Sequence, residues 1–260
     1  MNRIPDYITL TCDIVAWMCK YCNDNKIESL VVGVSGGIDS AVSSTLAAKT
    51  GLPTYVVGMP IKQNDAQETL SDAHMYWLEK NYKNVTVLKA DLSDVFGKFT
   101  ETIGKECGME YVVNKMACAN SRSRLRMVTL YQIAASVDGI VVGTGNKVED
   151  YGVGFYTKYG DGGVDIAPIA DLYKTEVREL GRAFGVISEI IDAKPTDGLW
   201  DDGRTDEDQI GASYEDLEYA MEHGTGPAVR VLHDFHCKNK HKMNPIPTYK
   251  LEVKKECVSA

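Results

Sequence analysis

The sequence lacks long apolar runs, an excess of positive charge and a regular set of cysteines, and each absence argues against a class of protein. No stretch is long and apolar enough to span a bilayer. Residues 1–6 contain no apolar core of the kind that a signal peptide needs. We therefore expect no membrane association and no export.

Basic residues are outnumbered, with 28 Lys and Arg against 37 Asp and Glu and a formal net charge of −9. Duplex DNA and tRNA are bound mainly through a basic protein face. The charge balance therefore argues against a nucleic-acid partner.

The seven cysteines are odd in number and irregularly spaced, which favours free thiols in a reducing compartment, the cytoplasm. Cys19 and Cys22 have the spacing of a redox or zinc pair. They lie within a helical pattern and no second pair follows, so buried thiols are the favoured interpretation and redox or metal chemistry is the alternative.

Strand-like and helix-like segments alternate along the 260 residues, with no internal repeat and no low-complexity segment. This alternation is typical of right-handed βαβ units, which place ligands at the carboxyl ends of the strands. We predict one domain over residues 1–260 with an α/β fold, a doubly wound parallel sheet with helices on both faces and a C-terminal helical extension. The predicted strands are 30–34, 54–59, 84–89 and 139–143, and the predicted helices are 6–24, one starting after Asp39, 65–81, 91–107, 112–137, 172–184, 187–192, 213–222 and 226–239.

One stretch organises the chain: an apolar strand ends at Ser35-Gly36-Gly37, and a helical pattern begins after Asp39. Glycines in such a turn let backbone N–H groups face an anion, and the helix that follows adds its positive dipole end. No lysine follows the glycines, so the turn is not a Walker A loop. Asp39 would repel a bare phosphate and is better suited to a magnesium ion that accompanies a nucleotide. The alternative is a tight turn in which Asp39 only caps the helix.

Later segments add two clusters of polar residues. The segment 143–149 is polar and follows the carboxyl end of the fourth predicted strand, and 152–163 is rich in glycine and aromatic residues. Arg122 and Arg126 share one face of a predicted helix, with Arg124 pointing largely the other way, and we interpret the first two as solvated surface charges. The acidic segment 195–212 has no apolar period and is expected to be a mobile lid.

Together these stretches resemble the ammonia-dependent NAD synthetases, a family of N-type ATP pyrophosphatases. The resemblance covers essentially the whole chain, and the block Thr157-Lys-Tyr-Gly-Asp-Gly-Gly163 is its most specific part. It implies an adenine-nucleotide-hydrolase-like fold. The other matching segments are 35–40, 143–149, 171–176, Pro195-Thr196 and His241-Lys242.

The resemblance implies that ATP and magnesium activate the carboxylate of deamido-NAD as an adenylate, releasing pyrophosphate, and that ammonia then displaces AMP. It assigns Asp161 to the entering ammonia and gives catalytic roles to Lys174 and Asp39 as well. Asp39 and Glu149 are implied to bind Mg2+. This chain has one extra residue between Glu149 and Phe155, so Asp150 is an alternative metal ligand.

The substrate contacts implied by the resemblance fall into two sets. The ATP set is Gly33, Ser35, Gly36, Gly37, Asp39, Ser40, Thr144, Lys174 and Thr196, and the deamido-NAD set is Arg124, Lys158, Asp165, His241 and Lys242. For His241 and Lys242 the alternative is a solvated basic tail. The resemblance also implies a homodimer with deamido-NAD near the subunit boundary.

Three alternatives to this function stay open. A different ATP pyrophosphatase could amidate a purine nucleotide or thiolate tRNA, although the acidic charge disfavours tRNA. A nucleotide sensor could bind ATP on the same fold without turnover. Free ammonia is the expected nitrogen donor because 260 residues cannot also hold an amidase domain, unless a separate amidase chain supplies it.

Overall fold

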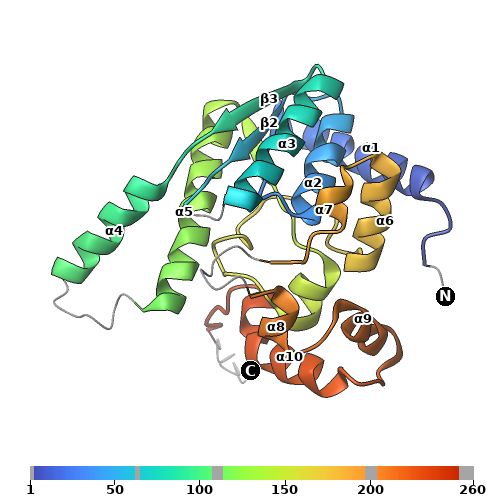
Figure 1. Ribbon diagram of the computed structural model, residues 1–260, viewed down its shortest axis with the longest axis vertical. Coiled ribbons are helices and arrows are strands. Elements are labelled where there is room, and N and C mark those ends of the chain that lie inside the picture. The colour runs from blue at the N-terminus through green and yellow to red at the C-terminus, as the bar shows by residue number, and fades with distance from the viewer. Residues whose placement is uncertain (1–2, 62–64, 107–113, 197–203, 252–260) are drawn as a thin grey trace, which may run out of the picture.

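Four parallel strands form the sheet in a computed structural model of the chain, which describes residues 3–61, 65–106, 114–196 and 204–251 (Figure 1). The strands are β1 (Ser29–Gly33), β2 (Thr54–Gly58), β3 (Val85–Lys89) and β4 (Gly139–Val142), in the order β3-β2-β1-β4. From β1 the chain adds β2 and β3 on one side of the sheet and then returns to place β4 on the other side of β1. Open α/β sheets bind ligands at such a switch point. The predicted parallel α/β sheet is confirmed.

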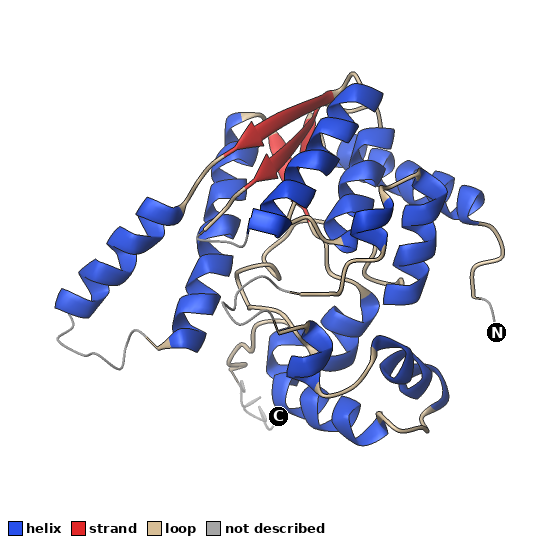
Figure 2. Ribbon diagram, viewed as in Figure 1, coloured by secondary structure: helices blue, strands red, loops and turns tan. Residues whose placement is uncertain are grey.

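Helices cover both faces of this sheet, as Figure 2 shows. One face of the sheet packs through Leu30, Val32 and Val142 against a group of helices given below. The other face packs through Val31, Val57 and Val141 against the long helix α5. The first group is α1 (Tyr7–Asn25), α2 (Ile38–Lys49), α3 (Asp65–Asn81), α6 (Lys174–Phe184) and α7 (Ser188–Ile191); α4 (Ser93–Glu106) and α5 (Lys115–Ser136) extend outward together on the other side.

A C-terminal helical unit lies below the carboxyl ends of the strands in Figure 1. Its helices pack on the short π-helix η2 that follows β4, through a buried cluster that includes Val148, Tyr214 and Leu217. The C-terminal extension predicted from the sequence therefore lies next to the carboxyl ends of the strands. Its elements are η2 (Val148–Val153), α8 (Asp206–Ile210), α9 (Tyr214–His223) and α10 (Val229–Met243).

The acidic segment 195–212, which was expected to be a mobile lid, is partly helical. Thr205 and Asp208 form a reciprocal capping box at the start of α8, so this short helix begins without an apolar period. Asp206 and Ile210 are buried. Residues 197–203 of the expected lid lie outside the described part of the chain.

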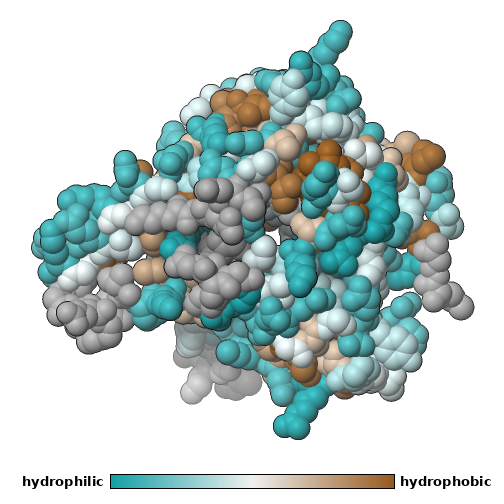
Figure 3. All heavy atoms as spheres, in the orientation of Figure 1, coloured by the Kyte–Doolittle hydropathy of each residue, from teal (hydrophilic) through white to brown (hydrophobic). Residues whose placement is uncertain are grey.

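The face of the molecule in Figure 3 is mostly hydrophilic, with apolar side chains scattered over it. Within the described ranges, none of the helices combines the length and apolar character that crossing a membrane requires. The cysteines Cys12, Cys19, Cys22, Cys118 and Cys237 are free thiols. Cys22 is buried and the Cys19 thiol donates to the Thr50 carbonyl, which agrees with the structural interpretation of this pair.

A buried histidine makes the stability of the fold depend on pH. His74 on α3 is 1% exposed, stacks on Trp77 and lies 3.1 Å from the Ser44 hydroxyl through Nε2. Burial lowers the pKa of His74 to about 4. The unfolded chain therefore takes up a proton on this residue near its ordinary pKa of about 6.5, while the folded chain does not. Stability from neutral His74 is present above pH 6.5 and is lost as the pH falls toward 4.

When the pH falls from 7 to 4, the free energy of unfolding decreases in both proteins. We expect this decrease to be about 3 kcal/mol smaller in the His74→Gln variant than in the wild type. Urea unfolding at several pH values measures the difference. His223→Gln supplies the matched control, since it removes a histidine whose side chain is 45% exposed instead of a buried one. Parallel slopes for His74→Gln and wild type would show that His74 is not held neutral.

Candidate active site

The turn between β1 and α2 forms the floor of the site. Gly36 has φ +88°, and a Cβ there would lie 2.6 Å from the Gln67 carbonyl oxygen, so only glycine fits. The Ser40 hydroxyl accepts from the Ser35 backbone N–H and donates to the Gly37 carbonyl, which closes the turn on itself. The N–H groups of the first turn of α2 have no partner within the helix, and the N-cap residue Gly37 offers no side chain to them. This geometry suits an anion at the helix N-terminus.

Three charged side chains meet beside this turn. The Lys174 ammonium, from the first turn of α6, bonds to the Asp39 carboxylate and lies 3.0 Å from Glu149 Oε1. Lys174 is 3% exposed; burial alone would lower its pKa, but Asp39 and Glu149 outweigh burial and raise it. Burial raises the pKa of Asp39, against the opposing effect of Lys174. One lysine therefore contacts two carboxylates, so the wall carries more negative than positive charge.

Asn146 links the Asp39 carboxylate to the backbone of η2, and sequence reasoning gave it no role. Its Nδ2 donates to Asp39 Oδ1 at 3.3 Å, and its Oδ1 accepts from the backbone N–H groups of Val148 and Glu149. The side chain is fully buried. An asparagine just before an acidic first turn is a capping signal that could have identified it.

Glu149 and Asp150 point to different places. Glu149 lines the cavity and shares Lys174 with Asp39, whereas the Asp150 carboxylate lies over Gly145 and is not part of the cavity lining. Burial, with the charges of Glu149 and Asp161, raises the pKa of Asp150 to about 7. Glu149 is therefore the better placed of the two to share a cation with Asp39.

A magnesium ion fits the chemistry of Asp39 and Glu149. Mg2+ is commonly held by one or two carboxylates and completes its shell with water and substrate phosphates. Among the described residues there is no group of three or more His, Cys, Asp or Glu side chains that could hold a metal alone. Two carboxylates beside an anion-binding turn match a metal that arrives with a nucleotide.

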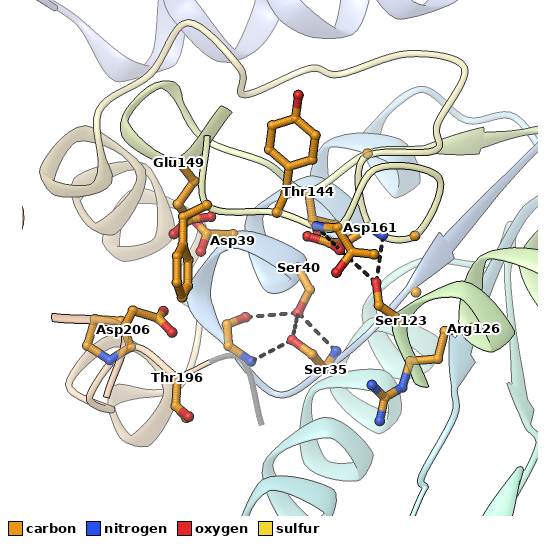
Figure 4. Close-up of a pocket in the computed structure, with 18 of the residues that line it drawn as sticks. Ser35, Asp39, Ser40, Ser123, Arg126, Thr144, Glu149, Asp161, Thr196 and Asp206 are labelled. Atoms are coloured by element: carbon orange, nitrogen blue, oxygen red, sulfur yellow. Dashed lines mark hydrogen bonds between the residues drawn. The ribbon is translucent and has the colours of Figure 1, made fainter. Parts of the chain in front are cut away.

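The opposite wall carries Asp161 from the loop after η2. Its Oδ1 accepts from the Ser123 hydroxyl at 2.6 Å and from the Thr157 N–H at 3.0 Å, while its own N–H donates to Ser123. Asp161 is exposed toward the cavity, and the protein around it displaces solvent, which raises the pKa of the carboxyl against the effect of those hydrogen bonds. Figure 4 shows Asp161 and Ser123 across the Ser35–Ser40 turn from Asp39 and Glu149.

These walls enclose a cavity of about 640 Å³ at the carboxyl ends of the strands. Every residue predicted for ATP lines it, as do Glu149 and Asp161. The nucleotide set thus comes together from the turn after β1, the loop after β4, the start of α6 and the segment before α8, namely Gly33, Ser35, Gly36, Gly37, Asp39, Ser40, Thr144, Lys174 and Thr196.

The deamido-NAD set is mostly outside the cavity lining. Arg124 is exposed and donates to the Lys158 carbonyl, and the Lys158 ammonium lies over the Tyr159 ring. Asp165 accepts from the Tyr131 hydroxyl and the Val141 N–H, which fixes the loop to β4. His241 is exposed on α10. The roles given to these four residues remain predictions.

Lys242 is the member of that set that lines the cavity. Its ammonium donates to the Gly154 and Tyr156 carbonyls at 2.6 and 2.8 Å, and burial lowers its pKa. The solvated-tail interpretation of Lys242 is therefore wrong. Lys242 ties α10 to the loop that carries Asp161.

Arg126 also lines the cavity, so the interpretation of this residue as a surface charge is wrong. Its Nε donates to the Met59 carbonyl at the end of β2, and Figure 4 shows its side chain beside Ser35 and opposite Glu149. The helical periodicity separated Arg124 from Arg126, but it did not show which face of α5 meets the sheet.

Comparisons with known proteins agree with this arrangement. Residues 10–242 match the NAD synthase family. An NH3-dependent NAD+ synthetase from Carboxydothermus hydrogenoformans is 37% identical over 233 residues, which cover 88% of this chain and 92% of that relative.

Two solved structures illustrate the structural similarity. An NMN synthetase from Francisella tularensis has a TM-score of 0.86 and 31% identity, with 95% of this chain and 99% of that chain covered. An NH3-dependent NAD synthetase from Campylobacter jejuni has a TM-score of 0.74 and 22% identity, with 95% of this chain and all of that chain covered, and it shows the shared fold.

Proposed function

This chain belongs to the NAD synthase family, and from that membership we propose that it converts deamido-NAD to NAD with ammonia as the nitrogen donor. It is a ligase that forms a carbon–nitrogen bond at the expense of ATP. The observation that carries the proposal is the cavity itself, which brings every predicted ATP residue together with Asp161. Family membership does not favour a tRNA-thiolating enzyme or a nucleotide sensor.

The reaction must overcome two chemical obstacles. A nicotinate carboxylate is a poor electrophile, and it is repelled by the α-phosphate that activates it. In the first step a carboxylate oxygen attacks the α-phosphorus of ATP and pyrophosphate leaves. In the second, ammonia attacks the carbonyl carbon, the bond to AMP breaks and the nitrogen gives up a proton. Positioning and charge stabilisation by the protein lower both barriers.

The residues of the acidic wall serve the first step. The N–H groups of the turn after β1 hold the phosphates, and the Lys174 ammonium offsets the charge that develops on the leaving pyrophosphate. Asp39 and Glu149 would hold Mg2+, which when bound neutralises phosphate charge. Arg126 supplies positive charge on the opposite side of the turn.

Asp161 serves the second step. One of its oxygens is fixed by Ser123 and Thr157, and the carboxylate faces the cavity. A carboxylate whose pKa is raised is a stronger base than an ordinary aspartate, and in this position it orients an attacking ammonia and accepts its proton. Lys242 fixes the position of the loop that carries this residue.

A mononucleotide substrate is a second candidate, favoured by the similarity to the NMN synthetase from Francisella tularensis. The TM-score of 0.86 and the 31% identity exceed the 0.74 and 22% of the Campylobacter jejuni NAD synthetase. Nicotinate mononucleotide carries the same carboxylate as deamido-NAD without the adenylate half. The steps assigned to Lys174 and Asp161 are the same for either substrate.

The purified protein tests the proposal when it is incubated with ATP, magnesium and either pyridine substrate, with ammonium or glutamine as the nitrogen source. We expect amide product with ammonium and not with glutamine, and AMP and pyrophosphate in equal amounts. The larger kcat/KM identifies the preferred substrate. ATP cleavage that requires neither pyridine substrate would contradict the proposal.

We propose a homodimer and a cytoplasmic location as well. Arg124 and Lys158 lie outside the cavity lining, so a substrate that reaches them extends beyond the cavity onto the surface of the subunit. The helices α4 and α5 also expose apolar side chains that a partner subunit would cover, namely Val95, Phe99 and Val128. The free thiols support a reducing compartment.

A further inference from the structure

Tyr214, at the start of α9, reaches the acidic wall from the C-terminal helical unit. It is 0% exposed, and its hydroxyl donates to Glu149 Oε1 at 2.6 Å across 65 residues of sequence. The Tyr214 N–H donates to the Glu207 carboxylate, and the Ser213 hydroxyl caps α9. The turn between α8 and α9 therefore fixes where this hydroxyl lies.

The packing of the ring does not explain the hydroxyl. The ring fills the apolar cluster that joins α8, α9 and η2, where a phenylalanine would pack equally well. A buried phenol must find a partner, and backbone carbonyls usually supply one. Here the main partner is a carboxylate of the cavity, with Asp206 Oδ2 at 3.5 Å as a second neighbour.

The hydroxyl determines which oxygen of Glu149 is used. Tyr214 and Lys174 both donate to Oε1, and within the described chain no donor reaches Oε2. Oε2 is thereby left for a ligand. The Tyr214 ring also lies 4.9 Å from the Lys174 ammonium, a favourable cation–π distance. Tyr214 itself is not part of the cavity lining, so it acts through Glu149 and Lys174.

We infer that Tyr214 is a positioning residue of the acidic wall: its hydroxyl holds Glu149 so that Oε2 faces the nucleotide-bound cation, and its ring supports Lys174. The inference rests on the proposed function only in assigning an ATP-bound divalent cation to this wall. The C-terminal helical unit then contributes to the nucleotide site, because its helix α9 carries the Tyr214 hydroxyl.

The Tyr214→Phe variant tests the inference, since it removes the hydroxyl and keeps the ring. Binding of Mn2+ is measured by electron paramagnetic resonance in the presence of a non-hydrolysable ATP analogue. We expect the dissociation constant for Mn2+ to rise about tenfold, as for the loss of a hydrogen bond to a charged group. The magnesium concentration that half-saturates turnover should rise in parallel, while KM for ammonium stays unchanged.

Tyr219→Phe is the matched control. Tyr219 lies on the same helix, is 48% exposed and stacks on His223, so its hydroxyl is remote from the wall. Wild-type Mn2+ affinity and magnesium dependence are expected for this variant. A Tyr214→Phe protein that binds Mn2+ as tightly as wild type overturns the inference, whatever its thermal stability.

A double-mutant cycle with Glu149→Gln keeps the test decisive if Tyr214→Phe lowers stability. If Tyr214 acts through Glu149, Tyr214→Phe should weaken Mn2+ binding less in the Glu149→Gln background than in the wild-type background. Equal effects in both backgrounds overturn the inference. Because these titrations contain no pyridine substrate, a wild type that fails to form NAD refutes the proposed function and leaves this comparison intact.

Discussion

Replacing Lys174 with methionine is expected to lower the rate of amide formation by about 10²–10³-fold and to destabilise the fold by about 3–5 kcal/mol. Methionine keeps much of the side-chain volume and removes the ammonium that Asp39 and Glu149 share. Two carboxylates then face each other in a buried wall without a counter-charge. The developing charge on pyrophosphate also loses its protein cation. Steady-state rates and urea unfolding measure the two effects.

Magnesium separates the two consequences of this substitution. Added Mg2+ or Mg-ATP is expected to recover part of the stability of Lys174→Met, because a cation between Asp39 and Glu149 replaces the lost charge. The catalytic defect should persist at saturating magnesium.

Lys147→Met supplies the control, since Lys147 pairs with Asp171, whose side chain is 86% exposed, at the surface. Its effect on stability is expected to stay below about 1 kcal/mol. A Lys174→Met enzyme with a normal rate at saturating magnesium would remove Lys174 from the chemistry.

The nucleotide half of the site was predictable because it lies next to strand ends. Buried parallel strands appear in the sequence as apolar runs, so the turn at Ser35–Ser40 and the loop at Thr144 could be placed from local pattern alone. The sheet then brings those carboxyl ends to one edge. Thr196 was placed by resemblance and also lines the cavity.

Contacts between distant segments were not predictable in this way. The period of α5 separated Arg124 from Arg126, but only the packing of Leu130 and Tyr131 against the sheet decides which arginine faces the cavity. Tyr214 meets Glu149 across 65 residues, and nothing local to α9 indicates that its hydroxyl is used. Side-chain partners set by tertiary packing require the structure.

Short elements were missed for a different reason. The helix α8 spans only Asp206–Ile210 and begins at a capping box, with Asp206 and Ile210 buried. A helix this short has no apolar period that the sequence could show. The π-helix η2 begins where Asn146 accepts from Val148 and Glu149, which is a side-chain contact within a polar segment. Both elements place acidic side chains in the cavity wall.

The Asp161→Asn variant is expected to form amide about 10²-fold or more slowly than wild type while it still activates the carboxylate. An asparagine oxygen can keep accepting from Ser123 and Thr157, so the loop geometry is retained. What the amide cannot do is take a proton from the attacking nitrogen. Substrate-dependent exchange of labelled pyrophosphate into ATP reports the first step alone, and we expect it to stay within about threefold of wild type.

Comparison of the two assays assigns Asp161 to a step. Loss of amide formation with normal exchange places the carboxylate at the entering ammonia, whereas equal losses in both assays place it in carboxylate activation. Asp171→Asn is the control, because this exposed aspartate follows the same loop and lies outside the cavity lining, and its variant should match wild type in both assays. Unchanged amide formation by Asp161→Asn would exclude Asp161 from the mechanism, and the burial that raises its pKa would then have only a structural consequence.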